Sequence, residues 1–160
     1  MGWSLKREKM TEFLENIKTP GENFRCMLWG TIYTNPLNFQ NRSVASIAMS
    51  MTGTPGVVGS LSGGFCYIGL TDQSLYVVAV DSYNTSIVTG NFAIPFADMK
   101  FLKMRVALFG VSRTVEVTSD VLYMSLTVKG VTLGTDIYDQ KERMWEFWQT
   151  MESLRDRLPA

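Results

Sequence analysis

The sequence predicts a mainly β protein of the α+β class, an antiparallel barrel or sandwich with one helix at each end of the chain. Three observations predict it. Short segments in which apolar and polar residues alternate recur at intervals of about 8–12 residues after residue 64. The two longest segments with the 3.6-residue apolar period of a helix lie at the two ends of the chain. The length of 160 residues suits a single domain, residues 1–160, that can bury a sizeable core.

The N-terminal helix is expected over residues 4–18, with Ser4 as its N-cap. Charged residues occupy one side of this helix and apolar residues the other. The apolar stripe consists of Leu5, Met10, Phe13, Leu14 and Ile17. Proline at position 20 and glycine at position 21 then end the helix, because proline cannot continue it and glycine favours a turn.

A first strand is expected from Phe24 to Tyr33, where the apolar period changes from 3.6 to 2. A long insertion over residues 35–64 follows, made of a short amphipathic helix and then a glycine-rich loop from Thr52 to Gly64. The apolar positions of that short helix are Val44, Ile47, Ala48 and Met51. Residues 43–71 carry no charge, but serine, threonine and glycine interrupt them too often for a membrane-spanning helix.

Six further strands are expected, each bounded by residues that favour turns. Their ranges are 65–71, 75–80, 91–94, 101–108, 113–118 and 121–128. In the strand 101–108, the alternation turns one set of residues toward the interior, Leu102, Met104, Val106 and Leu108, and the other set outward, Phe101, Lys103 and Arg105. In the strand 121–128, the residues that share one face are Leu122, Met124, Leu126 and Val128. Together with the first strand, they make a barrel of about seven strands over residues 24–128.

The C-terminal helix is expected over residues 136–158, with Asp136 as its N-cap and Asp139 near the positive end of the helix dipole. An aromatic and apolar stripe runs along it and has to pack on another surface, which the open end of a barrel would supply. The stripe consists of Met144, Trp148, Met151, either Leu154 or Arg155, and Leu158. Trp145 lies beside the stripe and is expected to be partly exposed.

Three local features resemble one known family. Residues 69–75, Gly-Leu-Thr-Asp-Gln-Ser-Leu, form a strand–turn–strand motif, and residues 93–99, Ala-Ile-Pro-Phe-Ala-Asp-Met, form a step into the next strand. With the aromatic helix over residues 137–158, they resemble the bacterial PH-like and GRAM-like domains of the pleckstrin-homology-like superfold. The resemblance implies a PH-like barrel of about seven antiparallel strands, capped by the C-terminal helix. The N-terminal helix and the insertion 35–64 are extra to that core.

The composition excludes several kinds of chemistry. The chain has no histidine, which removes Ser-His-Asp and Cys-His catalysis and imidazole ligation of metals. Its 15 Lys and Arg balance 15 Asp and Glu, so no overall charge attracts nucleic acid. Cys26 and Cys66 are too few for a zinc site and are either two buried thiols in a reducing compartment or one bridged or redox pair. We therefore expect a cytoplasmic protein without enzymatic activity, cofactor or metal.

Two surfaces remain as candidates for binding. The first is a basic face on a stretch without acidic residues, which consists of Lys100, Lys103, Arg105 and Arg113. It is either a patch for an acidic partner or anionic membrane, or an ordinary solvated face balanced by Glu116. The second is an interaction loop in the uncharged segment, represented by Val57, Val58 and Leu61.

These observations favour a non-catalytic binding or scaffold module that acts through an unknown protein partner or through self-association. The alternative is a peripheral binder of anionic membrane lipid that uses the face from Lys100 to Arg113. A third hypothesis is a small-ligand carrier or enzyme that uses the barrel interior. Phosphoinositide-binding members of the resembled superfold carry a basic cluster on and between the first two strands. Residues 26–71 hold Arg42 as their only cation, so specific phosphoinositide binding is not expected.

Overall fold

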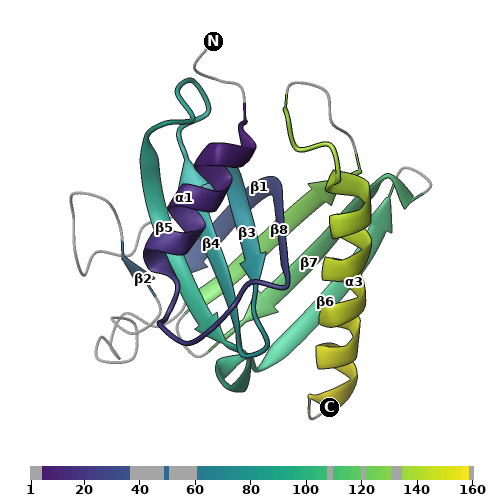
Figure 1. Ribbon diagram of the computed structural model, residues 1–160. Helices are drawn as coiled ribbons and strands as arrows, with labels where there is room; N and C mark the ends of the chain where they lie inside the picture. The colour runs from purple at the N-terminus through teal and green to yellow at the C-terminus, as the bar shows by residue number, and fades with distance from the viewer. Residues whose placement is uncertain are drawn as a thin grey trace.

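The computed structural model describes residues 5–36, 49–50, 61–107, 110–119, 122–130 and 135–158. Within these ranges, two helices accompany an antiparallel sheet (Figure 1). The elements in chain order are α1 (Arg7–Ile17), β1 (Cys26–Pro36), β2 (Met49–Ser50), β3 (Leu61–Leu70), β4 (Ser74–Val80), β5 (Val88–Pro95), the 3-10 turn η1 (Phe96–Asp98), β6 (Phe101–Ala107), β7 (Ser112–Thr118), β8 (Leu122–Lys129) and α3 (Gln140–Arg157). The mainly β, α+β class predicted from the sequence is confirmed.

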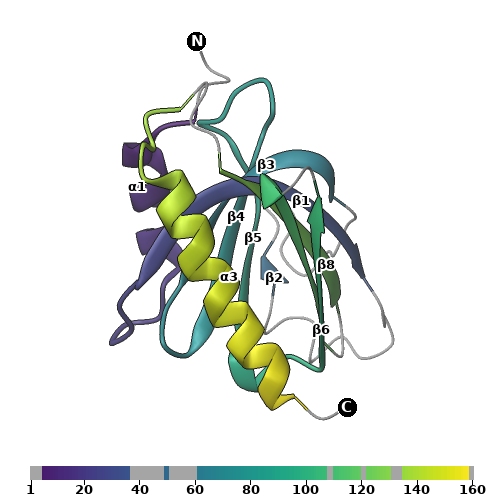
Figure 2. The same cartoon turned by 90° about the vertical axis from the view of Figure 1, so that its right-hand side faces the viewer.

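The strands lie in the order β2-β5-β4-β3-β1-β8-β7-β6. Strand β1 is the centre of the sheet: it pairs with β3 from Cys26 to Thr34 and with β8 from Thr31 to Pro36. A register shift between Ile32 and Tyr33 marks a bulge, a feature that bends a strand. The sheet curls around α3, which crosses its concave side (Figure 2). This arrangement agrees with the predicted PH-like barrel of about seven antiparallel strands and a capping C-terminal helix, to which the short strand β2 is added.

The main core fills the space between the curled sheet and α3. Alternate residues of β1 and of β3 to β8 point into it, as the period of 2 predicts. Strand β8 contributes Leu122, Met124, Leu126 and Val128. Helix α3 contributes Met144, Phe147, Trp148, Met151 and Leu154. The predicted inward face of β8 and the predicted stripe of the C-terminal helix are therefore confirmed, and the interior is packed with apolar side chains.

A second core lies on the opposite face of the sheet, under α1. Met10, Phe13 and Leu14 of the helix pack there against Trp29, Tyr67, Tyr76, Val78 and Val80. Strand β4 is consequently buried on both faces, which explains its unbroken apolar run. The tyrosine hydroxyls are also used: Tyr67 accepts a hydrogen bond from the Lys6 amide and Tyr76 from the Thr19 amide. Helix α1 is thus an integral layer of the fold.

The beginning of α3 differs from the sequence prediction. The helix starts at Gln140, with Asp139 at its N-cap, and the predicted cap Asp136 lies outside it. Asp136 instead accepts a hydrogen bond from the Arg7 amide, the first amide of α1. Leu5 and Thr135 form a parallel bridge that brings the two segments together. An aspartate predicted to cap its own helix therefore satisfies a free amide of a distant one.

Several boundaries also move, because strand pairing extends elements that the local pattern leaves as loops. Residues 61–64, expected as loop, belong to β3, where Gly64 pairs with Ile32. Met49 and Ser50, expected in a short helix, form β2 and pair with β5. Val106, expected to point inward and be buried, is exposed because β6 lies at the edge of the sheet. The first strand, expected to end near Tyr33, continues to Pro36. Ser4, the predicted cap of the first helix, and residues 37–48 and 51–60 of the insertion lie outside the described residues.

Candidate functional site

The predicted basic face is divided by the sheet. Arg113 of β7 pairs in register with Val106 of β6. Lys103 pairs with Glu116, and these two residues belong to the alternate set, which points to the opposite face of the sheet. Paired residues of antiparallel strands point to the same face, so Arg113 points toward α3 and Lys103 points away from it. Lys100, Lys103 and Arg105 are exposed, whereas Arg113 is buried. The structure therefore corrects the prediction: Arg113 does not belong to the basic face.

The remaining basic face is partly neutralised. Nε of Arg105 lies 3.2 Å from Oε2 of Glu116, and the Tyr123 hydroxyl donates a hydrogen bond to the same carboxylate. Burial and then the Glu116 carboxylate raise the pKa of Tyr123, which keeps its hydroxyl a donor. Lys100 and Lys103 form no ion pair within the described residues. The net positive charge of this face thus rests on two lysines.

The basic face lies beside a free sheet edge. Among the strands that the structure describes, β6 pairs with β7 alone and ends the sheet. Phe101 and Val106, near its two ends, are 58% and 52% exposed. We call Phe101, Lys103, Arg105 and Val106 the β6 edge surface. It combines unpaired main-chain groups with apolar and cationic side chains.

The candidate interaction loop stays a prediction. Val57 and Val58 lie outside the described residues, and Leu61 is the first residue of β3, which pairs there with Thr34 of β1.

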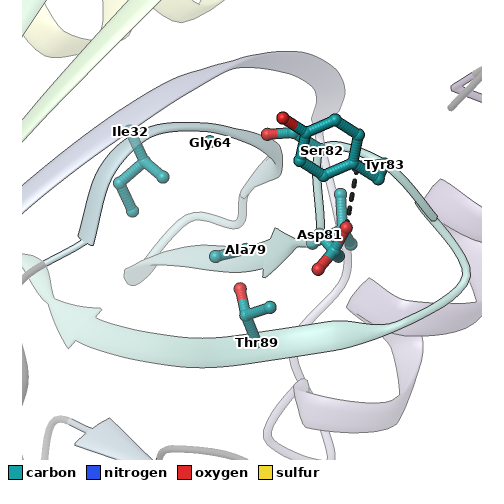
Figure 3. A pocket seen from close by; sticks show the side chains of 8 residues that line it. Ile32, Gly64, Ala79, Asp81, Ser82, Tyr83 and Thr89 are labelled. Atoms are coloured by element: carbon teal, nitrogen blue, oxygen red, sulfur yellow. Dashed lines mark hydrogen bonds between the residues drawn. The ribbon is translucent and has the colours of Figure 1, made fainter.

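A hollow of about 250 Å³ lies at one end of the sheet, between β3, β4 and the β4–β5 connection (Figure 3). Its carboxylate, Asp81, accepts hydrogen bonds from the amides of Tyr83, at 2.7 Å, and Asn84, at 3.0 Å. This is the turn geometry expected of an aspartate that follows a strand. The Asp81 carboxylate therefore already accepts hydrogen bonds within its own turn, and no second charged residue lines the hollow.

The two cysteines are separate, buried, free thiols. Cys66 pairs with Gly30, four residues along β1 from Cys26, which is about 13 Å at the rise of a strand. A disulfide needs Cα atoms within about 7 Å, so the two do not form a bridge. Burial raises the pKa of Cys26 to about 12 and raises that of Cys66 as well. Neither thiol is a reactive thiolate.

A second hollow, of about 200 Å³, lies beside the start of β1 and is lined by three arginines. Each has a carboxylate partner: Arg7 pairs with Asp139, Arg25 with Asp72, and Arg143 with Asp139 and Glu146. Among the described residues, no group of three or more His, Cys, Asp or Glu side chains could hold a metal ion. None of the described helices has the length and apolar character that crossing a membrane requires.

Arg113 lies in a third hollow, of about 270 Å³, between the β6–β7 turn and the first turns of α3. Its guanidinium carbon is 4.2 Å from the ring centre of Trp145 and 4.8 Å from that of Trp148. Trp145 is 44% exposed, as the sequence predicts. The burial of Arg113 was not predicted, although its alternation with Val115 and Val117 places all three residues on one face.

No family model matches this chain, and no curated protein matches it either. Among solved structures, it is similar to the hSac2 domain from the human phosphoinositide phosphatase Sac2. The sequence identity is 9%, the TM-score is 0.47, and the alignment covers 96% of this chain and 82% of that one. A likeness at this level carries no argument about what this chain does.

Proposed function

We propose that this protein is a non-catalytic binding module that holds an extended, acidic segment of a partner protein along the free edge of β6. The observation that carries the proposal is the β6 edge surface. Among the described strands, β6 has no partner on its outer side, and it exposes both apolar and cationic side chains.

An edge strand of this kind is a template for strand addition. Its free N–H and C=O groups hydrogen-bond the main chain of an extended peptide, and side chains beside it select the sequence. Phe101 lies on the same face of β6 as Lys103, whereas Val106 points to the opposite face, beside Arg113. The two sets of side chains of an added strand would therefore meet the cations on one face and Val106 on the other. A segment that alternates apolar and acidic residues matches this surface.

The charge of β6 favours a different protein over a second copy. Residues 100–107 hold three cations and no carboxylate. Two copies joined edge to edge through β6 would bring cations against cations, which destabilises a strand pair. An acidic segment meets the same lysines favourably.

The resemblance of residues 69–75 and 93–99 to bacterial PH-like and GRAM-like domains, and a cytoplasmic location, belong to this proposal. The membrane alternative is less favoured, because Arg113 faces α3 and Arg105 is paired with Glu116. A flat anionic surface would therefore meet mainly Lys100 and Lys103.

The test uses two fluorescent decapeptides, one alternating valine with glutamate and the other valine with lysine, titrated against the full chain and followed by anisotropy. We expect binding of the glutamate peptide alone, and a loss of about tenfold or more with Lys103→Glu. Lys129→Glu is the matched control, since Lys129 is also an exposed strand lysine but lies on β8. It should leave the affinity unchanged.

Equal binding of both peptides, or an affinity that ignores Lys103→Glu, would overturn the proposal. The membrane alternative is tested in parallel by co-sedimentation with vesicles of phosphatidylcholine, with and without phosphatidylserine. Sedimentation that requires phosphatidylserine and is lost in Lys103→Glu, together with no peptide binding, would replace the proposal with the membrane alternative.

A further inference from the structure

Arg113 is the one charged side chain that is buried in the part of the chain that the structure describes, at 8% exposure. It is the second residue of β7, after Ser112, and points into the space between the sheet and α3. Burying a charge costs free energy unless the charge is paired. The buried charge of Arg113 therefore needs groups that stabilise it.

Two indole rings and one carbonyl hold the guanidinium in place. Trp145 and Trp148 lie at cation–π distances, and Nε donates a hydrogen bond to the carbonyl of Gly110 at 3.3 Å. Gly110 has a φ of +93°, a conformation that glycine adopts readily, so the turn presents this carbonyl to the arginine. Cation–π contacts stabilise the guanidinium but leave its charge in place.

No described carboxylate lies within ion-pair distance of Arg113. Residues 108–109 and 131–134, the neighbours of Gly110 and Gly130 in the sequence, include no acidic residue. The hollow beside β1 differs in this respect, because every arginine there has its carboxylate. Among the described residues, Arg113 is thus a buried cation without a carboxylate partner.

The hollow next to Arg113 has room for that anion. Lys141, exposed on the first turn of α3, adds a second cation to its lining. Val111, Met144 and Trp145 supply an apolar wall. Gly130 keeps the space open, since a Cβ there would lie 3.3 Å from Cε of Met144. The lining therefore joins two positive charges to an apolar surface and contains no carboxylate.

We propose that this hollow binds a small organic anion, with its carboxylate or phosphate group on Arg113 and Lys141 and an apolar or aromatic body against Val111 and Trp145. The planar guanidinium suits an oxyanion, because it can donate two parallel hydrogen bonds. A volume of about 270 Å³ limits the ligand to a small molecule. The site faces α3 and does not depend on the proposed peptide edge of β6.

The test titrates the full chain with benzoate and with phenyl phosphate, followed by tryptophan fluorescence and calorimetry, with benzylamine as the cationic control. We expect at least one anion to bind with a dissociation constant below about 1 mM, and benzylamine not to bind. Whichever anion binds more tightly identifies the oxyanion as carboxylate or phosphate.

Substitutions locate the binding. Arg113→Gln should weaken the affinity for the anion by about tenfold or more. Arg113→Lys keeps the charge but loses the paired donors, so it should weaken the affinity by less. Because Arg113→Gln can also destabilise the fold, Lys141→Gln on the exposed rim is the second variant and should weaken binding severalfold. Lys129→Gln, an exposed lysine that does not line the hollow, should have no effect.

Two results would overturn the proposal. One is that neither anion binds up to about 10 mM, or that benzylamine binds as well as benzoate. The other is that the affinity for the anion is the same in Lys141→Gln, Arg113→Lys and the unsubstituted protein. Arg113 would then be a purely structural side chain held between two tryptophans.

Discussion

At the scale of single residues, Gln140 shows how one buried amide can join distant elements. Its Nε2 donates to the carbonyls of Trp29, at 2.8 Å, and Lys129, at 3.0 Å, and its Oε1 accepts from the Trp29 amide at 3.1 Å. Strand β8 pairs with β1 only from Thr31 onward, so Gln140 supplies the partner that Trp29 lacks on that side. A glutamine at the start of a helix is common, and nothing in the sequence indicated this role.

Replacement of this glutamine tests its importance. Gln140→Leu leaves a buried N–H and two carbonyls without partners, so the free energy of unfolding should fall by about 2–4 kcal/mol. Glu142→Leu, an exposed position two residues further along α3, should change it by less than about 0.5 kcal/mol. Urea unfolding followed by tryptophan fluorescence measures both. Equal losses in the two variants would show that the Gln140 hydrogen bonds contribute little.

At the scale of elements, the first turns of α1 and α3 are joined by charge. Arg7 of α1 and Arg143 of α3 both bond the Asp139 carboxylate. Partial burial raises the pKa of Asp139, but the hydrogen bonds from Arg7 and Arg143 outweigh it and lower the pKa below its usual value of 3.8. The ionised carboxylate is therefore favoured by folding, and its contribution to stability is present above pH 3.8 and lost as the pH falls through the lowered value.

Asp139→Asn tests this link through pH. The variant should be less stable than the unsubstituted protein near about pH 7, and the difference should shrink as the pH falls below about 4. Thermal unfolding at a series of pH values measures the difference directly. A difference in stability that stays constant across this range would mean that Asp139 acts through shape and not through charge.

Elements with a strong local period were predictable from the sequence, and those that depend on distant partners were not. The stripe of α3 and the inward face of β8 follow from spacing alone. The first four residues of β3 could not be predicted, because Gly64 is strand only through its pairing with Ile32. Asp136 was misassigned for the same reason: its partner is 129 residues away.

At the scale of the whole molecule, each face of the sheet packs against a different helix. The outer face of β3 and β4 is covered by α1, and the concave face is filled by α3, so both helices serve packing. Of the described strands, β6 retains a free edge with exposed apolar and basic residues. The sequence indicated Lys103, Arg105 and Phe101 as one outward face. It could not show that this face lies at the end of the sheet, because strand order depends on long-range pairing.

The most direct test of this account maps where a partner binds. Backbone amide shifts of the full chain, recorded by NMR while the valine–glutamate decapeptide is added, report each residue separately. We expect the largest changes in amide shift along β6, from Phe101 to Ala107, and small changes in α1 and β4. The largest changes on α1, or around the hollow at Asp81 and Tyr83, would contradict it.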